Sequence, residues 1–363
     1  MLQKLFAGPS ALLGRLGTMR ALDDERLDAI LKGVSRSFYL SLAVLPRAVR
    51  AQLSVAYLVA RAADTVADTE VIPRGERAAL LGALKQAIVA PELAQATSAK
   101  IKGALAGTSA VAPGNAQETA LMQALDTCLA ALHRFEPFDL LATERVLDTL
   151  LTGMQRDLER FDGRLYVLPT LADLDEHCYF AAGCVGEYWT QITHHHHERL
   201  MPVDIGEQTA RGVRLGKGLQ YVNVLRDTPR DLLDGRCYMP QELLSAYDLT
   251  PEDLKDPARR RRGKDAARYL SDVALCHFDA GFEYIEAIPS HERRLRLPVI
   301  LPLWIGLETL RALRAADDPF DPAAPVKIPR ERVYRLMVEA SLGLIAEPVL
   351  HELQRLRREV FRA

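Results

Sequence analysis

The chain has 363 residues, of which 48% are hydrophobic and 26% are charged, a composition typical of a soluble globular protein of one large or two ordinary domains. Its 46 basic and 48 acidic residues give a net charge of −2, which excludes a general electrostatic attraction to nucleic acid, so we expect anion binding to be local. The five cysteines include no Cys-x-x-Cys pair and are odd in number, which predicts buried free thiols in a reducing cytoplasm rather than disulfides or a zinc site.

The N-terminal stretch LFAGPSALLGRLG is interrupted by Pro9 and Arg15, so we expect neither a signal peptide nor a membrane-spanning helix there. No later run reaches eighteen apolar residues. The longest candidate, Leu297–Leu307, contains Pro298 and Pro302 and predicts a buried, kinked helix.

From Asp23 onward the helix-forming residues Ala, Leu, Arg and Glu dominate, and no sustained alternation of β-branched residues occurs. This pattern predicts an all-α fold in which strands are nearly absent. The segment Pro91–Gln117 is rich in Ala, Gly, Ser and Thr and predicts a long loop or a frayed helix. We divide the chain into an N-terminal segment 1–30 without an assigned role, an all-α domain 31–345 and a charged C-terminal helix 346–363.

An acidic motif, YLVARAADTVAD, lies at Tyr57–Asp68. Its residues Tyr57, Arg61, Asp64 and Asp68 recur at intervals of three and four, which predicts that they share one face of a helix. Two carboxylates four residues apart lie about one 5.4 Å turn apart and can share divalent cations.

A second acidic motif lies in LGKGLQYVNVLRDTPRDLLDGRCYMP, where Gly216, Gln220, Asn223 and Asp227 form one polar helical stripe. Polar groups turned inward cost several kcal/mol without partners, so the stripe predicts a water-filled or ligand-filled pocket. Asp231 follows Asp227 by four residues. Pro229 between them predicts an interrupted helix, so that Asp231 reaches a metal from a kinked or ending helix. The alternative is a solvated surface helix.

Together the two motifs predict a diphosphate clamp. Oxygen ligands without nearby Cys or His favour Mg²⁺, which bridges carboxylates to phosphates. Arg61 and Arg226 stand beside the acids and suit phosphate oxygens. The chemistry that such a clamp favours is ionisation of an allylic diphosphate. The predicted metal ligands are Asp64, Asp68, Asp227 and Asp231.

The sequence resembles the squalene/phytoene synthase family of head-to-head prenyl transferases. The resemblance covers about Leu31–Met337 and rests on SRSFYLSLAVLP, YLVARAADTVAD, HCYFAAGCVGEYW, LGKGLQYVNVLRDTPRD and GRCYMP, in the order of the family. DTVAD looks more like the DTVED of squalene synthases than the DDxxD of phytoene synthases, and VKIPRERVYRLM looks like the segment that squalene synthases use near the reductant. The resemblance implies a single-domain isoprenoid synthase fold with a central active-site cavity, across which the two acidic motifs face each other.

This resemblance implies a Mg²⁺-dependent enzyme that joins two molecules of farnesyl diphosphate to presqualene diphosphate and reduces it to squalene with NADPH. The chain has no GxGxxG unit, so we expect a nicotinamide site that is not of the Rossmann type. The alternatives are a dehydrosqualene or phytoene synthase without a reduction step and a non-catalytic helical binding module. We expect a monomer that binds no nucleic acid, either free in the cytoplasm or in peripheral contact with the inner face of the membrane.

The resemblance also implies roles for individual residues. His177 stands where the family usually has a tyrosine credited with proton handling, so that role passes to His177 or to Tyr179; a core or helix-end histidine is the alternative. The family has a second arginine two positions after Lys327, where this chain has Pro329 followed by Arg330. The implied catalytic residues are Tyr57, Arg61, His177, Tyr179 and Arg226; the substrate-binding residues are Ser35, Arg36, Ser37, Phe38, Gln220, Arg236 and Pro302; and the reductant-binding residues are Asn223, Lys327 and Arg330.

Two charged tracts stand outside these motifs. The four histidines His194–His197 are typical of a solvated loop, because neighbours in a row point in different directions; a metal site is the alternative. The basic run Arg259–Lys264 is typical of a solvated segment, with contact to anionic lipid as the alternative, since the implied product is a hydrocarbon.

Overall fold

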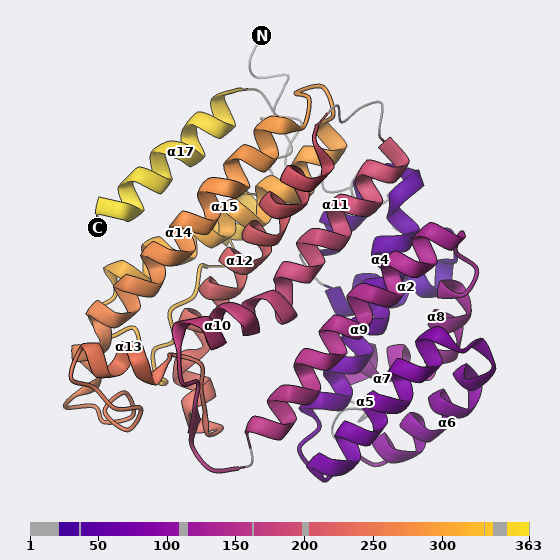
Figure 1. The fold of residues 1–363 in the computed structure, drawn as a ribbon, viewed down its shortest axis with the longest axis horizontal. Coiled ribbons are helices and arrows are strands. Elements are labelled where there is room, and N and C mark those ends of the chain that lie inside the picture. Colours follow the sequence, from indigo (N-terminus) through magenta and orange to yellow (C-terminus); the bar gives the residue numbers. More distant parts are fainter. Residues whose placement is uncertain are drawn as a thin grey trace. The chain divides into compact units, whose positions relative to one another are not determined.

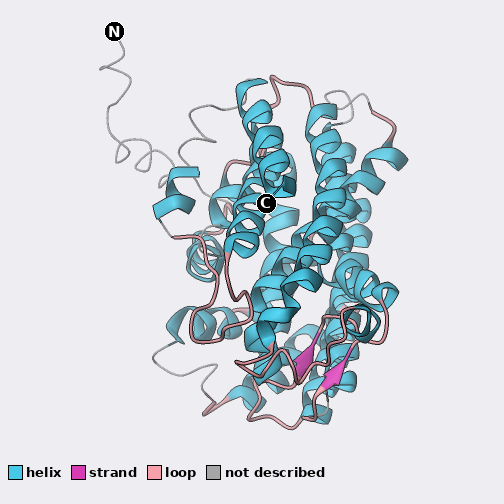
Figure 2. Ribbon diagram, turned by 90° about the vertical axis from the view of Figure 1, so that its left-hand side faces the viewer, coloured by secondary structure: helices cyan, strands magenta, loops and turns pink. Residues whose placement is uncertain are grey.

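The computed structural model describes residues 22–35, 38–108, 115–161, 163–197, 203–329, 331–336 and 347–362. The chain forms two compact units: unit 1 comprises Met1–Leu158 and Gln191–His196, and unit 2 comprises Glu159–Thr190 and His197–Ala363. Helices make up nearly all of the regular structure that is described, and the strands seen in Figure 2 are two residues long each. The predicted all-α fold is therefore confirmed, as is the near absence of strands.

Unit 1 is built around helix α4 (Arg47–Asp68), which packs against α5, α7 and α8. Val49, Leu58, Val59 and Val66 on α4 are completely buried. Because these apolar residues occupy one side of the helix, the polar residues of the first acidic motif lie on the remaining, partly exposed side. The other elements of this unit are α2 (Glu25–Ser35), α3 (Phe38–Ala43), α5 (Arg74–Val89), η2 (Pro91–Leu93), α6 (Ala94–Leu105), α7 (Ala116–Gln123), α8 (Leu125–Leu132), most of α9 (Pro137–Arg160) and the end of α11 (Cys184–His197).

Of the two predictions for Pro91–Gln117, a long loop or a frayed helix, helix α6 contradicts the long loop. Most of this segment is helical, since η2 leads directly into α6 (Figure 1). Ile101 and Leu105 on α6 are completely buried, and the helix packs against α5 and α8. Ala, Gln and Lys are good helix formers, and a few large apolar side chains at helical spacing suffice to hold such a helix in place. Residues 109–114 lie outside the described part of the chain.

Unit 2 is organised around the long helix α12 (Ile205–Leu233), which lies beside α14 (Lys264–Ala287) in Figure 1 and also packs against α15 (Arg293–Ala315). Helix α15 contains Pro298 and Pro302 and is largely buried, which confirms the predicted buried helix. Within the segment predicted to be a charged C-terminal helix, α17 spans Glu347–Arg362. The remaining elements are β1 (Tyr166–Val167), α10 (Leu171–Cys178), η5 (Tyr179–Gly183), the start of α11, β2 (Arg236–Cys237), α13 (Gln241–Ala246) and η7 (Arg260–Gly263).

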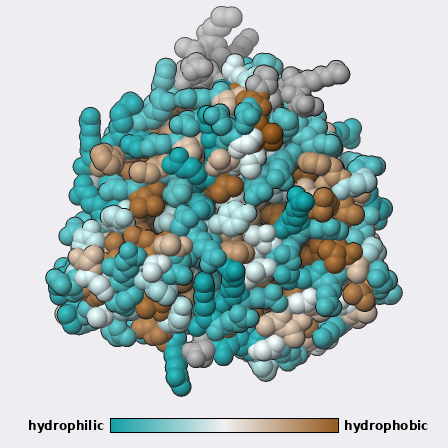
Figure 3. Space-filling view, in the orientation of Figure 1, coloured by the Kyte–Doolittle hydropathy of each residue, from teal (hydrophilic) through white to brown (hydrophobic). Residues whose placement is uncertain are grey.

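The distribution of hydrophobic residues on the surface and the state of the cysteines can be compared with what the composition predicts. In the view of Figure 3, hydrophobic residues occur in small groups between hydrophilic ones. Among the described residues, no helix combines the length and the hydropathy that crossing a membrane requires.

All five cysteines are free thiols. Cys276 is exposed, contrary to the expectation that all are buried, because it lies on the solvent side of α14.

Strands β1 and β2 pair in parallel, with Tyr166 opposite Arg236 and Val167 opposite Cys237. Gly235, between α12 and β2, has a φ of 76°. This left-handed conformation is favourable only for glycine and is typical of the residue after a helix C-terminus. The turn ends α12 abruptly and places Arg236 immediately after the acidic end of the helix.

Helices α11 and α12 approach each other so closely that glycines are required at the contact. A Cβ atom on Gly186 of α11 would lie 2.0 Å from the carbonyl oxygen of Gly212, and one on Gly216 would lie 2.3 Å from that of Ala182 in η5. Backbone meets backbone at both points, so no side chain can rotate away to make room. These glycines determine how α10, η5 and the start of α11 lie on α12.

We expect Gly186→Ala to destabilise the protein by about 1–3 kcal/mol, because the added methyl group overpacks this backbone contact. Gly103→Ala is a matched control: Gly103 is helical and exposed, and a Cβ there would have nothing within 4 Å. The control should stabilise by about 0.5–1 kcal/mol. Urea unfolding followed by circular dichroism measures both changes, and an unaltered unfolding midpoint for Gly186→Ala would contradict the assigned constraint.

Candidate active site

In unit 1 the first acidic motif lies on the partly exposed face of α4. Arg61 Nη1 lies 3.8 Å from Asp64 Oδ2, and Arg61 Nη2 donates a 2.6 Å hydrogen bond to Glu118 Oε1. The surrounding protein atoms and the negative charge of Asp68 raise the pKa of Asp64 to about 7, with Arg61 acting in the opposite direction. Asp68 is exposed at the end of the same helix. This face therefore holds more negative charge than Arg61 neutralises, which favours a bound cation.

Glu118 is a residue of this site that the sequence analysis missed. It is 8% exposed, lies on α7, and accepts hydrogen bonds from Arg61 and from the Thr65 hydroxyl, the latter at 2.9 Å. The carboxylate thereby fixes the guanidinium beside Asp64. The sequence offers no local signal for this pairing, because Glu118 is 57 positions from Arg61.

The other predicted residues of unit 1 lie around the start of α3. The rings of Phe38 and Tyr57 are 5.3 Å apart between centroids, and the Tyr57 hydroxyl donates to the Val34 carbonyl at 3.4 Å. The Ser35 hydroxyl donates to the Leu31 carbonyl at 2.5 Å, within its own helix. Arg36 and Ser37 lie outside the described residues.

In unit 2 the second acidic motif lies on α12, and this helix continues through Pro229 to Leu233. Of the two predicted alternatives, a helix that ends at Pro229 is therefore wrong, while a kink there stays a prediction. Proline removes only the hydrogen bond to the Leu225 carbonyl, while Thr228 and Pro229 are buried against the rest of the unit and the Thr228 hydroxyl donates to the Val224 carbonyl at 2.6 Å. Tertiary packing outweighs the single lost bond, so Asp231 is presented by a continuous helix.

The predicted polar stripe on α12 forms a connected series of contacts. Asn223 Nδ2 donates to Gln220 Oε1 at 3.1 Å, and Gln220 Nε2 lies 3.5 Å from His177 Nε2. One turn further along, Arg226 donates two hydrogen bonds to Asp227, at 2.8 and 2.5 Å. Both the amides and the charged pair are only partly buried, so the stripe remains accessible to a ligand.

Asp231 and Arg236 complete this charged group at the end of α12. Arg236 Nη2 lies 3.3 Å from Asp231 Oδ1, and the side chain of Asp231 is 15% exposed. Burial raises the pKa of Asp231 to about 6; Arg236 opposes this change, and the carboxylates of Asp227 and Asp234 reinforce it. As on α4, acidic groups crowd together with a guanidinium between them.

The two candidates for proton handling lie in different surroundings. His177 is 9% exposed, and its ring lies 4.4 Å from that of Tyr238. Tyr179, in the π-helical turn η5, donates its hydroxyl proton to Glu187 Oε2 at 3.0 Å. Burial and this hydrogen bond raise the pKa of Tyr179 to about 12. The phenol thus keeps its proton near neutral pH.

Of the predicted reductant residues, Asn223 belongs to the polar stripe, Lys327 is exposed, and Arg330 lies outside the described residues. A helix begins at Glu331, and residues 331–336 of it are described. Its Arg332 pairs with the buried Glu308 of α15 at 2.6 Å, which anchors this segment to unit 2. Pro302, on α15, is half-buried.

The basic run Arg259–Lys264 is partly neutralised. Arg259 pairs with Asp253 at 2.7 Å, and Arg260 pairs with Asp318 at 2.6 Å and with Asp321 at 2.9 Å. Two of its guanidiniums therefore serve internal ion pairs, which leaves less charge for a lipid surface.

Comparison with known proteins relates these residues to a family. The sequence matches the profile of the family described as squalene/phytoene synthase over residues 31–332. A bifunctional lycopene cyclase/phytoene synthase of Colletotrichum graminicola is 29% identical over 301 residues, which cover 81% of this chain and 47% of that protein. A squalene synthase of Candida albicans is 26% identical over 296 residues, which cover 78% of this chain and 61% of that protein. The chain thus spans about half to three-fifths of the length of these relatives.

Solved structures share the fold. The structure of TcSQS in complex with a ligand gives a TM-score of 0.72 at 20% identity and covers 94% of this chain and 98% of that one. A dehydrosqualene synthase in complex with a ligand gives a TM-score of 0.61 at 20% identity, covering 88% of this chain and 95% of that one. At this level of identity the likeness shows the fold alone, and the fold is that of an isoprenoid synthase.

We expect Glu118→Ala to destabilise the protein by about 2 kcal/mol, because it removes hydrogen bonds to a charged group and leaves Arg61 and Thr65 without their buried acceptor. Glu92 is exposed and provides the control, since Glu92→Ala should change stability by less than about 0.5 kcal/mol. Urea unfolding compares the two variants. Equal stabilities would show that Glu118 does not fix Arg61.

Proposed function

The chain belongs to the squalene/phytoene synthase family, and from this premise we propose that it joins two molecules of farnesyl diphosphate to presqualene diphosphate and reduces this intermediate to squalene with NADPH. The observation that carries the proposal is the pairing of guanidiniums with crowded carboxylates on two separate helices. Arg61 lies with Asp64 on α4, and Arg226 lies with Asp227 on α12. Such groups suit a substrate whose reacting end is a diphosphate.

The carboxylates of both motifs fit Mg²⁺. Oxygen donors are the ligands that this cation prefers. Burial, together with neighbouring carboxylates, raises the pKa of Asp64 to about 7 and that of Asp231 to about 6, and a bound cation would favour the ionised form of both. Asp64 and Asp68 would hold the metal on α4, and Asp227 and Asp231 would hold it on α12. Bound Mg²⁺ supplies positive charge that stabilises a departing diphosphate.

The arginines bind and orient the diphosphate. Arg226 makes a bidentate contact with Asp227, the same fork geometry that a phosphate group accepts, so its planar guanidinium is already oriented for a second anion. Glu118 also holds Arg61 in place, with one carboxylate oxygen that accepts from both Nε and Nη2 of the guanidinium. These fixed groups stabilise the negative charge that develops on the leaving diphosphate without first having to reorganise.

Aromatic rings of unit 1 and a histidine of unit 2 have further proposed roles. Phe38 and Tyr57 present neighbouring rings near the start of α3, and such faces stabilise a carbocation through cation–π contact. For proton removal in the first half-reaction we favour His177 over Tyr179. An imidazole can accept a proton near neutral pH, whereas the Tyr179 phenol is held by Glu187 and retains its own proton.

A dehydrosqualene or phytoene synthase is the second candidate, and the likeness to proteins that carry those names supports it. These activities share the ionisation step and end by proton loss without a reductant. The segment around Lys327 and the DTVAD motif favour squalene, because both look like the corresponding segments of squalene synthases.

The test is incubation with farnesyl diphosphate and Mg²⁺, with and without NADPH, followed by identification of the hydrocarbon. We expect squalene with NADPH, and a loss of turnover of about 100-fold or more in Asp64→Asn and Asp227→Asn, since each removes charge from a metal ligand at nearly constant volume. Glu207→Gln on α12 is the control, because the Glu207 side chain is 69% exposed and pairs only with Arg211 among the described residues. Near-native rates in either aspartate variant would contradict the clamp, and a product independent of NADPH would favour the second candidate.

Lys327→Ala should spare presqualene diphosphate formation and slow its NADPH-dependent conversion to squalene. Only the second half-reaction needs the reductant, and the exposed Lys327 is free to bind a phosphate of NADPH. Lys255→Ala, at another exposed lysine of unit 2, should change neither step. Single-turnover analysis of both products separates the half-reactions. Parallel losses would assign Lys327 to the shared diphosphate site instead.

A further inference from the structure

The histidine tract is the feature for which the structure departs most from the sequence prediction. His194–His197 form the last turn of α11 rather than a solvated loop. The part of α11 that contains His195 and His196 belongs to unit 1, where it lies near the start of α9. A helical tract can present a defined pair of imidazoles to a neighbouring helix, which a loop of four histidines would not do.

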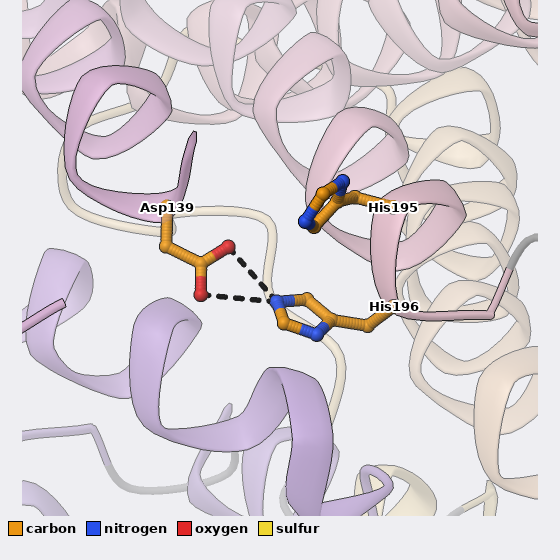
Figure 4. Close-up of side chains that lie close together, drawn as sticks. All are labelled: Asp139, His195 and His196. Atoms are coloured by element: carbon orange, nitrogen blue, oxygen red, sulfur yellow. Dashed lines mark hydrogen bonds and ion pairs between the residues drawn. The ribbon is translucent and has the colours of Figure 1, made fainter. Parts of the chain in front are cut away.

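We propose that Asp139, His195 and His196 form a binding site for a transition-metal cation of the Zn²⁺ type, separate from the acidic motifs. Figure 4 shows both imidazoles and the carboxylate converging from α11 and α9. His196 Nε2 lies 2.9 Å and 3.0 Å from the two carboxylate oxygens of Asp139. One donor atom from each of the three residues lies within 4.8 Å of the others.

The carboxylate is fixed in place before any metal binds. Asp139 is 2% exposed, and Gln52 Nε2 donates to its Oδ2 at 2.6 Å. A hydrogen bond of this kind, behind a ligating carboxylate, is the usual support of a metal ligand. Gln52 is itself 8% exposed, and its Oε1 is buried without a hydrogen-bond partner among the described residues.

The imidazoles are positioned by two further features. His195 is exposed, but its ring stacks on Phe138 of α9, with centroids 3.9 Å apart and planes 15° apart, so the ring is held against α9 next to Asp139. His195 and His196 also lie in the last turn of α11, where the helix dipole favours positive charge, and Asp139 lies in the first turn of α9, where it favours negative charge. The end of α11 therefore favours a bound cation directly, whereas the start of α9 stabilises the negative charge of the Asp139 carboxylate that would bind it.

The donor set selects the metal. Two imidazoles and one carboxylate suit Zn²⁺ or a similar transition metal, whereas Mg²⁺ prefers oxygen ligands alone. Tetrahedral Zn²⁺ with ligands at about 2.0–2.1 Å separates its donors by about 3.3 Å. The contact between His196 and Asp139 therefore needs to lengthen by only a few tenths of an ångström, and His195 needs to rotate inward. Three protein ligands leave one position for water.

The experiment uses the full chain without any affinity tag, because a histidine tag would bind the same metals. Titration of Zn²⁺ against a chromophoric competitor should give one tight equivalent in the wild type, and Co²⁺ should give the intense visible absorption of a tetrahedral site. We expect His195→Ala and His196→Ala to weaken binding at least tenfold. His194→Ala is the matched control from the same tract and should retain the site, as should Asp64→Asn.

Three outcomes would overturn the proposal. The wild type could take up no stoichiometric Zn²⁺, which would make Asp139 and His196 an ordinary buried acid–imidazole pair. His194→Ala could weaken binding as much as His195→Ala, which would indicate chelation by the tract as a whole. A millimolar excess of Mg²⁺ could displace the bound metal, which would contradict a nitrogen-rich site. Circular dichroism confirms that the exposed variant His195→Ala is folded, and since no substrate is involved, the result is independent of the proposed enzymatic function.

Discussion

The backbone contact between α12 and the run from η5 to α11 is the constraint on which unit 2 depends. Two helices can lie this close only where side chains are absent, and Gly186, Gly212 and Gly216 provide such positions. Because the contact is between backbones, the distance between the helices is set sharply. That distance allows His177 on α10 to reach Gln220, and it allows Lys217 to pair with Asp175 at 2.6 Å. The polar side chains of the stripe are therefore positioned by glycines, which have no functional side chain.

Both acidic motifs use the same electrostatic arrangement. Each places a guanidinium against a helical aspartate and adds a second aspartate one turn later, so that negative charge accumulates beyond what the arginine neutralises. Burial raises the pKa values of Asp64 and Asp231, and the neighbouring carboxylates reinforce this change. Crowded carboxylates of this kind destabilise the folded state when both are ionised, and a bound cation relieves the repulsion. Two residues outside the repeated pattern also act on these charges. Glu118 holds the Arg61 guanidinium by a hydrogen bond, and Arg236 lies beside the Asp231 carboxylate.

The cluster of Asp139, His195 and His196 differs from these motifs in the hardness of its donors. Oxygen-only faces and a nitrogen-rich site select different cations, so both can operate in one chain without competing for metal. This difference in donor atoms arises from the helices that carry the ligands at each site. Carboxylates spaced along one helix supply only oxygen, whereas the end of α11 brings imidazoles to the start of α9.

The sequence by itself determined the all-α fold, the two acidic faces and the family, because helical periodicity and motif order are local properties of the chain. Tertiary structure decided the rest. Helix α12 continues through Pro229, since burial of Thr228 and Pro229 outweighs one missing hydrogen bond. Segment 94–105 is helical, because Ile101 and Leu105 pack against neighbouring helices. Glu118 pairs with Arg61, and Asp139 pairs with His196; the two residues of each pair are 57 positions apart in the sequence. No periodic pattern in the sequence indicates such pairs, because only folding brings the two residues together.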